Sequence, residues 1–408
     1  MLNKFVQSRD RMRLAAVSAK LEQSPGHVAG KFKIFMPVLL LALFVAQAPA
    51  QAKKEGFKFE NIADSTQGLA GFSRFPAINN GGAVAFAATG SDRKQGVFKS
   101  QGGTLVTIAS QSGALDTFSD DVVINSAGVV GYGSNTGGND RTIFESDGAS
   151  TKTIVDAKQQ GLLGRFLGSP SINASGTAAF FAFRKNFSEA VFTGNGAALT
   201  TLADTADGNF SGFGNAAINS AGRVAFLGSF ADGSQGVFLG TPVRADEAND
   251  SRKPGPSRIT AIADASSSVF SDAGVSFGDP VINDAGTVAD VAFLSNLNLV
   301  IFTGDAAGIT ARTDPASAFF TNSEHPSLNN RGVVAFFAST INGGQGIYAE
   351  LTGGASPVVV IEAGDTLFGS TVTAVDLGRF GLNDRDQLAF SYDLQDGRSG
   401  IAVVSLGK

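Results

Sequence analysis

The sequence predicts an all-β fold, because one short hairpin motif recurs seven times along it. The first copy reads Ile-Asn-Asn-Gly-Gly at residues 78–82, and similar segments follow at 124–128, 172–176, 218–222, 282–286, 328–332 and 382–386. Most copies are about 46 residues apart and enclose four short strand-like runs, which is the size of one propeller blade and too long for one turn of a β-helix. These observations predict a seven-bladed β-propeller with four-stranded blades.

The motif has the chemistry of a tight turn. Its Asn can bond the backbone ahead of it, and a Gly three residues later can adopt positive φ because it has no Cβ. In the strand that follows the first copy, Val84 and Phe86 point to one face and Ala85 to the other, so both faces of the sheet are apolar and need covering by neighbours. We expect a structural role in the turn for Asn79, Gly82, Asn125, Gly128, Asn173, Gly176, Asn219, Gly222, Asn283, Gly286, Asn329, Gly332 and Asn383.

The two ends of the repeat region complement each other. Residues 57–64 are similar to the fourth strand of a repeat, whereas the chain ends after a third strand at 400–404. We therefore expect residues 57–64 to complete the last blade and to close the ring. Two departures are an insertion at 241–258 and the segment Thr287–Phe293, which has three more residues before its Phe than the other repeats and predicts a β-bulge.

The N-terminal region predicts export. An apolar run at 34–48 follows Lys31 and Lys33 and leads into Ala-Pro-Ala, so residues 1–50 are expected to be a signal peptide and residues 53–408 the propeller. The run is short for a membrane span, although an uncleaved anchor is the alternative. We expect a secreted or periplasmic protein with no stable membrane span after cleavage.

Composition excludes several classes of function. The chain has no Cys, so a disulfide, a thiol nucleophile and a thiolate metal site are excluded. Residues 1–50 carry seven basic and two acidic residues, so their removal changes the formal net charge from −5 to −10, which argues against nucleic acid as a partner. His325, beside Glu324, is the only His after the leader and could act as a general base, but its place before Pro326 indicates a surface loop.

Four copies of the motif resemble the bacterial NxxGxxAF tandem-repeat proteins, which carry varied surface anchors. The matching residues are Asn79, Gly82, Ala85 and Phe86, Asn173, Gly176, Ala179 and Phe180, Asn219, Gly222, Ala225 and Phe226, and Asn329, Gly332, Ala335 and Phe336. Repeat two departs with Gly131-Tyr132, and repeat seven has Asp386 in place of the Gly. The resemblance implies an exported protein and no established activity.

Two further residue types recur along the repeats. An Asp follows the fourth strand in six of them, with Ser110 in the second slot: Asp64, Asp156, Asp204, Asp264, Asp314 and Asp365. They could bind calcium or a cationic substrate, but an Asp at a strand end more often bonds the amides of the next turn. Phe72, Phe118, Phe166, Phe210, Phe270, Phe319 and Phe368 come next. They could line a binding face, but we expect them to plug the blade ends.

The leading functional prediction is an exported, non-enzymatic binding or scaffolding protein that holds a protein or polymer with its propeller-face loops. The insertion is the best candidate contact surface, through Arg244, Asp246, Glu247 and Asp250, with a solvated linker as the alternative. A hydrolase or lyase with carboxylates in the central channel is a second hypothesis, and calcium-dependent surface adhesion a third. We expect a monomer with no metal site and no cofactor, calcium being the one candidate, and an extracytoplasmic protein or polysaccharide as partner.

Overall fold

The computed structural model describes residues 56–112, 117–135, 141–242, 257–270, 274–296, 298–314, 319–320, 325–340, 344–351 and 356–407. The predicted signal peptide and most of the insertion, with Arg244, Asp246, Glu247 and Asp250, lie outside the described residues. No helix in this part of the chain is long and apolar enough to cross a membrane.

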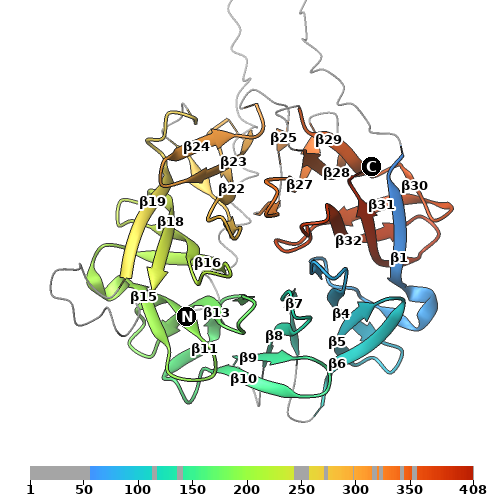
Figure 1. The fold of residues 1–408 in the computed structure, drawn as a ribbon, viewed down its shortest axis with the longest axis horizontal. Coiled ribbons are helices and arrows are strands. Elements are labelled where there is room, and N and C mark those ends of the chain that lie inside the picture. The colour runs from blue at the N-terminus through green and yellow to red at the C-terminus, as the bar shows by residue number, and fades with distance from the viewer. Residues whose placement is uncertain are drawn as a thin grey trace, which may run out of the picture. The chain divides into compact units, whose positions relative to one another are not determined.

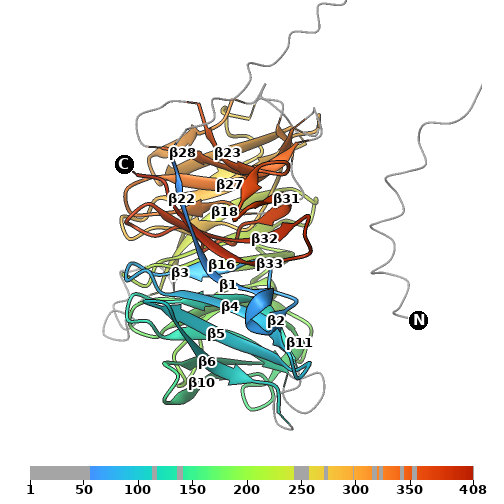
Figure 2. The ribbon, with the colours of Figure 1, turned by 90° about the vertical axis from the view of Figure 1, so that its right-hand side faces the viewer.

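The described residues form seven antiparallel sheets arranged in a ring around a common axis (Figures 1 and 2). In each sheet the strands follow one another outward from the axis in chain order, except that the outermost strand of the last sheet comes from the N-terminal end, and each following sheet is the next blade of the ring. The predicted seven-bladed propeller is confirmed. Its cores lie between blades, as the apolar faces predicted; one of them joins Phe86 of the first blade to Ala389 and Ile401 of the last.

The strands of the first four blades have the following bounds. Blade 1 contains β2 (Leu69–Ala70), β3 (Ala77–Ile78), β4 (Val84–Gly90), β5 (Gln95–Gln101) and β6 (Thr104–Ser110). Blade 2 contains β7 (Phe118–Ile124), β8 (Val130–Asn135), β9 (Arg141–Ser146) and β10 (Thr151–Asp156). Blade 3 contains β11 (Leu162–Leu167), β12 (Ser171–Ile172), β13 (Ala178–Arg184), β14 (Glu189–Gly194) and β15 (Thr200–Asp204). Blade 4 contains β16 (Gly212–Ile218), β17 (Val224–Ser229), β18 (Gln235–Pro242) and β19 (Ser257–Asp264).

The remaining blades continue in the same order. Blade 5 contains β20 (Ser276–Phe277), β21 (Val281–Ile282), β22 (Val288–Phe293), β23 (Leu299–Asp305) and β24 (Gly308–Ala311). Blade 6 contains β25 (Phe319–Phe320), β26 (Ser327–Leu328), β27 (Val334–Thr340), β28 (Gln345–Glu350) and β29 (Val358–Glu362). Blade 7 contains β30 (Thr366–Leu367), β31 (Ser370–Asp376), β32 (Gln387–Leu394), β33 (Ser399–Ser405) and β1 (Lys58–Asp64). Two short 3₁₀ turns are η1 (Ser65–Gln67) and η2 (Thr205–Asp207).

The N-terminal strand closes the ring. Strand β1 pairs antiparallel with β33, with Phe59 opposite Val404 and Asp64 opposite Gly400 (Figure 1, blue beside red). A Cβ at Gly400 would collide with the carbonyl oxygen of Ala63, so only Gly permits this close approach. The predicted closure by residues 57–64 is confirmed, and it covers an edge of the last sheet that would otherwise be free to pair with another chain.

The seven motif asparagines form a closed circle of hydrogen bonds, which we call the asparagine ring. Each Asn donates from Nδ2 to the backbone carbonyl of the Asn in the next blade, and the last bond joins Asn383 to Asn79 at 2.9 Å. All seven side chains are buried. The other six bonds are Asn79 to Asn125 (3.0 Å), Asn125 to Asn173 (3.2 Å), Asn173 to Asn219 (3.3 Å), Asn219 to Asn283 (3.0 Å), Asn283 to Asn329 (3.2 Å) and Asn329 to Asn383 (2.9 Å).

The same side chains hold their own turns. In each blade Oδ1 accepts the backbone N–H four residues ahead, as from Ala83 to Asn79 at 3.0 Å. The turn glycines adopt positive φ, and Asp386, which replaces the seventh, does so as well at φ 56°. The carboxylate of Asp386 forms an ion pair with Arg331 at 2.8 Å and accepts a hydrogen bond from Asn329 at 2.9 Å. These side-chain contacts stabilise the seventh turn, which lacks the Gly.

Blade 5 departs from the repeat without the bulge that the sequence predicted. Strands β22 and β23 pair in continuous register from Val288 to Phe293, so that prediction is wrong. Asp290 comes seven residues after Asn283, as Phe86 does after Asn79, and therefore takes the place of the repeat Phe, opposite Phe302.

The carboxyl group of Asp290 is fully buried. Its Oδ1 accepts from the backbone N–H of Val291 at 2.7 Å, whereas Oδ2 has no hydrogen-bond partner. Burial raises the pKa of Asp290 well above its usual range, with a contribution from the charge of Asp279. The group is therefore held in its neutral form at pH values where an exposed carboxyl is ionised.

We expect Asn383→Ala to lower the free energy of unfolding by about 2 kcal/mol, because it leaves buried backbone groups without partners. The measurement is thermal or urea unfolding. Asn195→Ala is the matched control, since Asn195 is exposed and makes a single bond of 3.3 Å with Ala197. Equal losses in the two variants would show that the asparagine ring does not hold the blades together.

We expect Asp290→Asn to remove a pH dependence of stability. The pKa of Asp290 is higher in the folded chain than in the unfolded chain, where it lies near 3.8, so the folded state binds the extra proton. Stability is then lost as pH rises from the unfolded pKa through the folded one. Urea unfolding at several pH values should show the advantage of Asp290→Asn growing with pH. An advantage independent of pH would contradict this account.

Candidate functional site

Seven side chains gather on the axis of the propeller, four residues before each ring asparagine. At this level the innermost strand of each blade is broken or shifted in register, as between β2 and β3 or between Phe213 and Ala216. The irregular backbone presents one residue per blade toward the axis. We call these residues the channel ring: Phe75, Asp121, Ser169, Asn215, Asp279, His325 and Arg379.

Blades 2 to 5 form a continuous hydrogen-bond network in the channel ring. The hydroxyl of Ser169 donates to Asp121 Oδ2, and the backbone N–H of Ser169 donates to Asn215 Oδ1 at 3.1 Å. Asn215 in turn donates to both carboxylate oxygens of Asp279, from its backbone N–H at 3.2 Å and from Nδ2 at 2.7 Å. A Cβ at Gly168 would collide with the Phe181 ring and lie 3.0 Å from Asn215 Oδ1, so the glycine before Ser169 leaves room for both side chains.

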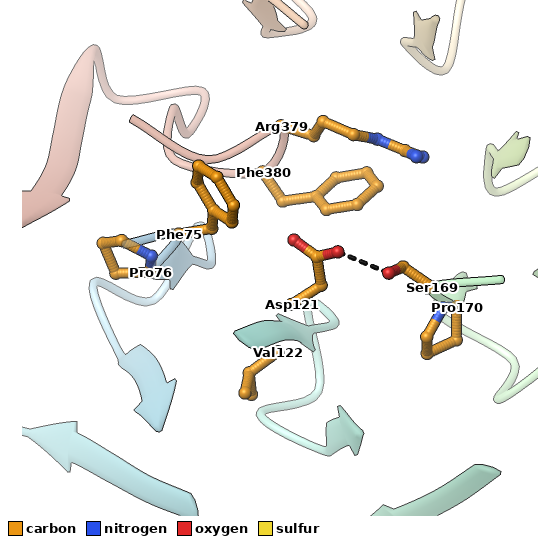
Figure 3. Close-up of a pocket in the computed structure, with 8 residues that line it drawn as sticks. All are labelled: Phe75, Pro76, Asp121, Val122, Ser169, Pro170, Arg379 and Phe380. Carbon is orange, nitrogen blue, oxygen red and sulfur yellow. Dashed lines mark hydrogen bonds between the residues drawn. The ribbon is translucent and has the colours of Figure 1, made fainter. Parts of the chain in front are cut away.

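Arg379 extends across the axis from blade 7 to blade 4. Its Nη2 donates to the carbonyl of Ala216 at 2.7 Å, and its Cζ lies 5.0 Å from the centre of the Phe380 ring. In the view of Figure 3 the Arg379 side chain runs alongside Phe380, whose ring lies between it and the pair of Asp121 and Ser169. These residues enclose a cavity of about 10 Å³, room for one water molecule.

His325 belongs to this ring, so its prediction as a surface loop residue is wrong. Its imidazole packs edge-on against Phe75 with ring centres 5.1 Å apart, and its Nε2 is enclosed without a hydrogen-bond partner. Burial, followed by the positive charge of Arg379, lowers the pKa of His325. The imidazole is therefore held neutral near pH 7, which leaves one ring nitrogen able to accept a proton or a hydrogen bond.

A second, wider cavity of about 170 Å³ opens on the asparagine-ring side, and we call it the mouth cavity. Phe380 lines both cavities and lies between them. At the rim of this cavity, carboxylates of one blade accept hydrogen bonds from backbone N–H groups of a neighbouring blade. Asp284 accepts from the backbone N–H of Ser220 at 2.9 Å, and Asp384 accepts from that of Asn330 at 2.7 Å. Burial acts to raise the pKa of Asp284, but the hydrogen bonds from Ser220 and Asn330 outweigh it and lower the pKa.

Among the other recurring residues, those whose side chains the structure describes include several with local structural contacts. Asp64 accepts from the Thr66 amide at 2.8 Å and Asp204 from the Ala206 amide at 2.9 Å, in agreement with a turn-capping role. Phe319 packs against Phe336 at 5.6 Å, as a blade plug should. No three His, Asp or Glu side chains among the described residues are grouped closely enough to hold a metal ion.

Sequence reasoning missed most of the channel ring. A signal was present at the position four residues before the motif Asn. The seven repeats carry six different residue types there, and every one of these types except Phe is polar. The flanking positions repeat, since the residue just before the Asn is Ile or Leu in every copy. Aligning the repeats on Asn and comparing position by position would have found it.

Comparison with solved structures supports the fold. The propeller is similar to an oligogalacturonate lyase from Vibrio parahaemolyticus, with a TM-score of 0.54 at 13% identity over 88% of this chain and 99% of that one. An oligogalacturonate lyase in complex with manganese has a TM-score of 0.53 at 11% identity, with the same coverage of 88% and 99%. A prolyl endopeptidase has a TM-score of 0.52 at 11% identity over 80% of this chain and 46% of that one.

This chain spans about half the length of the prolyl endopeptidase, and at such identities the likeness shows the fold alone. No curated protein sequence matches the chain. A family model does match, over residues 58–289 and again over 201–407, which together cover the whole propeller. The chain therefore belongs to DUF7453, a family of unknown function.

Proposed function

We propose that this protein is an exported, non-enzymatic binding protein that recognises a polar group of its partner at the channel ring. The observation that carries the proposal is the diversity of this ring. Where every blade needs the same hydrogen bonds, the repeats carry the same residue, as the seven Asn of the asparagine ring show. Seven equivalent positions with Phe, Asp, Ser, Asn, Asp, His and Arg have no common structural task, but they suit an asymmetric ligand.

The geometry of the ring supports binding. Asp121 and Asp279 are held in place by Ser169 and Asn215, so their carboxylates are pre-organised as hydrogen-bond acceptors. Phe75 and Phe380 add apolar surface beside them, a combination that suits hydroxyl-rich or peptide groups. The partner that we propose is an extracytoplasmic protein or polysaccharide, in line with the apolar leader at residues 34–48.

We expect Asp121→Ala and His325→Ala to weaken partner binding at least about tenfold, because a lost hydrogen bond to a charged or buried group is worth about 1.5 kcal/mol or more. Binding is measured against purified polysaccharides and extracytoplasmic proteins from the producing cells. Asp120→Ala is the matched control, since Asp120 is exposed and adjoins Asp121 in the chain. If all variants bind the partner equally well, or if binding is lost only when residues 243–256 are deleted, the binding surface does not include the channel ring.

A hydrolase or lyase is the second candidate, and His325 is the observation that favours it. The imidazole is held neutral, with Nε2 free of partners, at the same level of the channel as Asp121 and Asp279. A neutral imidazole in such a place can serve as a general base. Similar propeller folds occur in the oligogalacturonate lyases and the prolyl endopeptidase described above.

On the binding proposal we expect no turnover of oligogalacturonate or of a prolyl peptide. Both are incubated with the wild-type chain and with His325→Gln, and products are measured by chromatography. Product formed by the wild type about 100-fold faster than by His325→Gln would match the loss of a general base and would replace binding by catalysis.

A further inference from the structure

The guanidinium group of Arg379 is a buried charge without an ion-pair partner. The residue is 7% exposed, and its contacts are the carbonyl of Ala216 and the ring of Phe380. Its Nε is enclosed and bonds nothing. Among the described residues no carboxylate lies within ion-pair distance of it. Burying an unpaired charge is strongly unfavourable, so buried charges are normally paired.

The unpaired groups lie together in one part of the channel. Blades 2 to 5 of the channel ring bond one another, whereas in blades 6 and 7 both His325 Nε2 and Arg379 Nε lack partners. Behind them Asp290 Oδ2 lacks one as well, and the charges of Arg379 and Asp279 both act on that carboxyl group. Blades 2 to 5 are therefore saturated, whereas this part of the channel keeps one open donor, Arg379 Nε, and one open acceptor, His325 Nε2, for a group from outside the chain.

We propose that Arg379 binds a carboxylate group of the ligand, an inference that rests on the binding function proposed above. The planar fork of a guanidinium matches the two oxygens of a carboxylate, and Nε offers a free donor beside Nη2. In the neutral imidazole of His325, Nε2 is an acceptor, so it can accept a hydrogen bond from a hydroxyl or amide group of the ligand next to that carboxylate. The ligand would then be an acidic sugar, an acidic peptide side chain or a peptide C-terminus.

The size and charge of the site favour a carboxylate over phosphate. The cavity beside Arg379 holds about 10 Å³, the space of one water molecule, so any anion must displace Phe380, and a planar carboxylate requires a smaller displacement than a tetrahedral phosphate. Asp121 and Asp279 carry negative charge on the same ring and repel a dianion more strongly than a monoanion. A carboxylate bears the single charge that Arg379 can balance.

The test uses the whole chain and small carboxylates. Thermal unfolding is followed in sodium formate and sodium acetate, with formamide and acetamide as neutral counterparts and sodium chloride and phosphate at equal ionic strength. We expect formate and acetate to raise the melting temperature with increasing concentration, because a ligand that binds only the folded state stabilises it. The shift should be lost in Arg379→Met and kept in Arg74→Met, whose Arg is exposed and pairs with Asp376.

Without any ligand, Arg379→Met should melt higher than the wild type, because the variant no longer buries an unpaired charge. If that variant does not fold, the Nε–H resonance of Arg379 in the wild type, followed by NMR during a formate titration, decides the question. The proposal is overturned if carboxylates produce no shift, if the amides or phosphate produce as large a shift, or if the Nε–H resonance does not move. If carboxylates fail this test but Asp121→Ala and His325→Ala still weaken partner binding, the proposed binding function stands and only the carboxylate as the recognised group is wrong.

Discussion

One amide side chain per blade holds this propeller together. Buried backbone groups must be hydrogen-bonded, and the inner end of every blade carries a turn whose amide and carbonyl groups face the crowded axis. The motif Asn meets both demands, since Oδ1 serves its own turn and Nδ2 serves the carbonyl of the next blade. The circle closes only when the last blade meets the first, which β1 ensures from the outer edge.

The asparagine ring also explains where a binding site can form. It fixes the inner strands at one level, so the residues four positions earlier are brought to a common level on the axis. The backbone there is irregular and makes few demands on side-chain type, apart from space left by residues such as Gly168. Side chains at this level can therefore differ from blade to blade. The seven blades repeat the same backbone, and yet the channel ring can have a different residue in each of them.

Polar groups in and behind the channel ring are kept at some cost in stability. Asp290 replaces an aromatic residue of the core and is neutral when buried, and Arg379 is charged without a partner. At the position of Asp290 the other six blades pack an aromatic residue, Tyr132 in blade 2 and Phe in the rest, and stability alone would favour an apolar residue in place of Arg379 as well. Departures from local rules of this kind concentrate at functional sites, because binding needs groups that are not already satisfied within the chain.

The sequence by itself determined the number of blades, the strand order and the closure by residues 57–64, because each depends on local turn chemistry and on a repeat that can be counted. It misassigned two features, one in blade 5 and one in the channel ring. The bulge at Thr287–Phe293 was wrong because counting to the next Phe concealed the Asp at the repeat position, and His325 was taken for a surface residue because only its own loop was considered. The tertiary structure alone decided which side chains meet on the axis. Residues from seven blades become neighbours only once the ring closes, and whether a loop residue is exposed depends on what the opposite blades place in front of it.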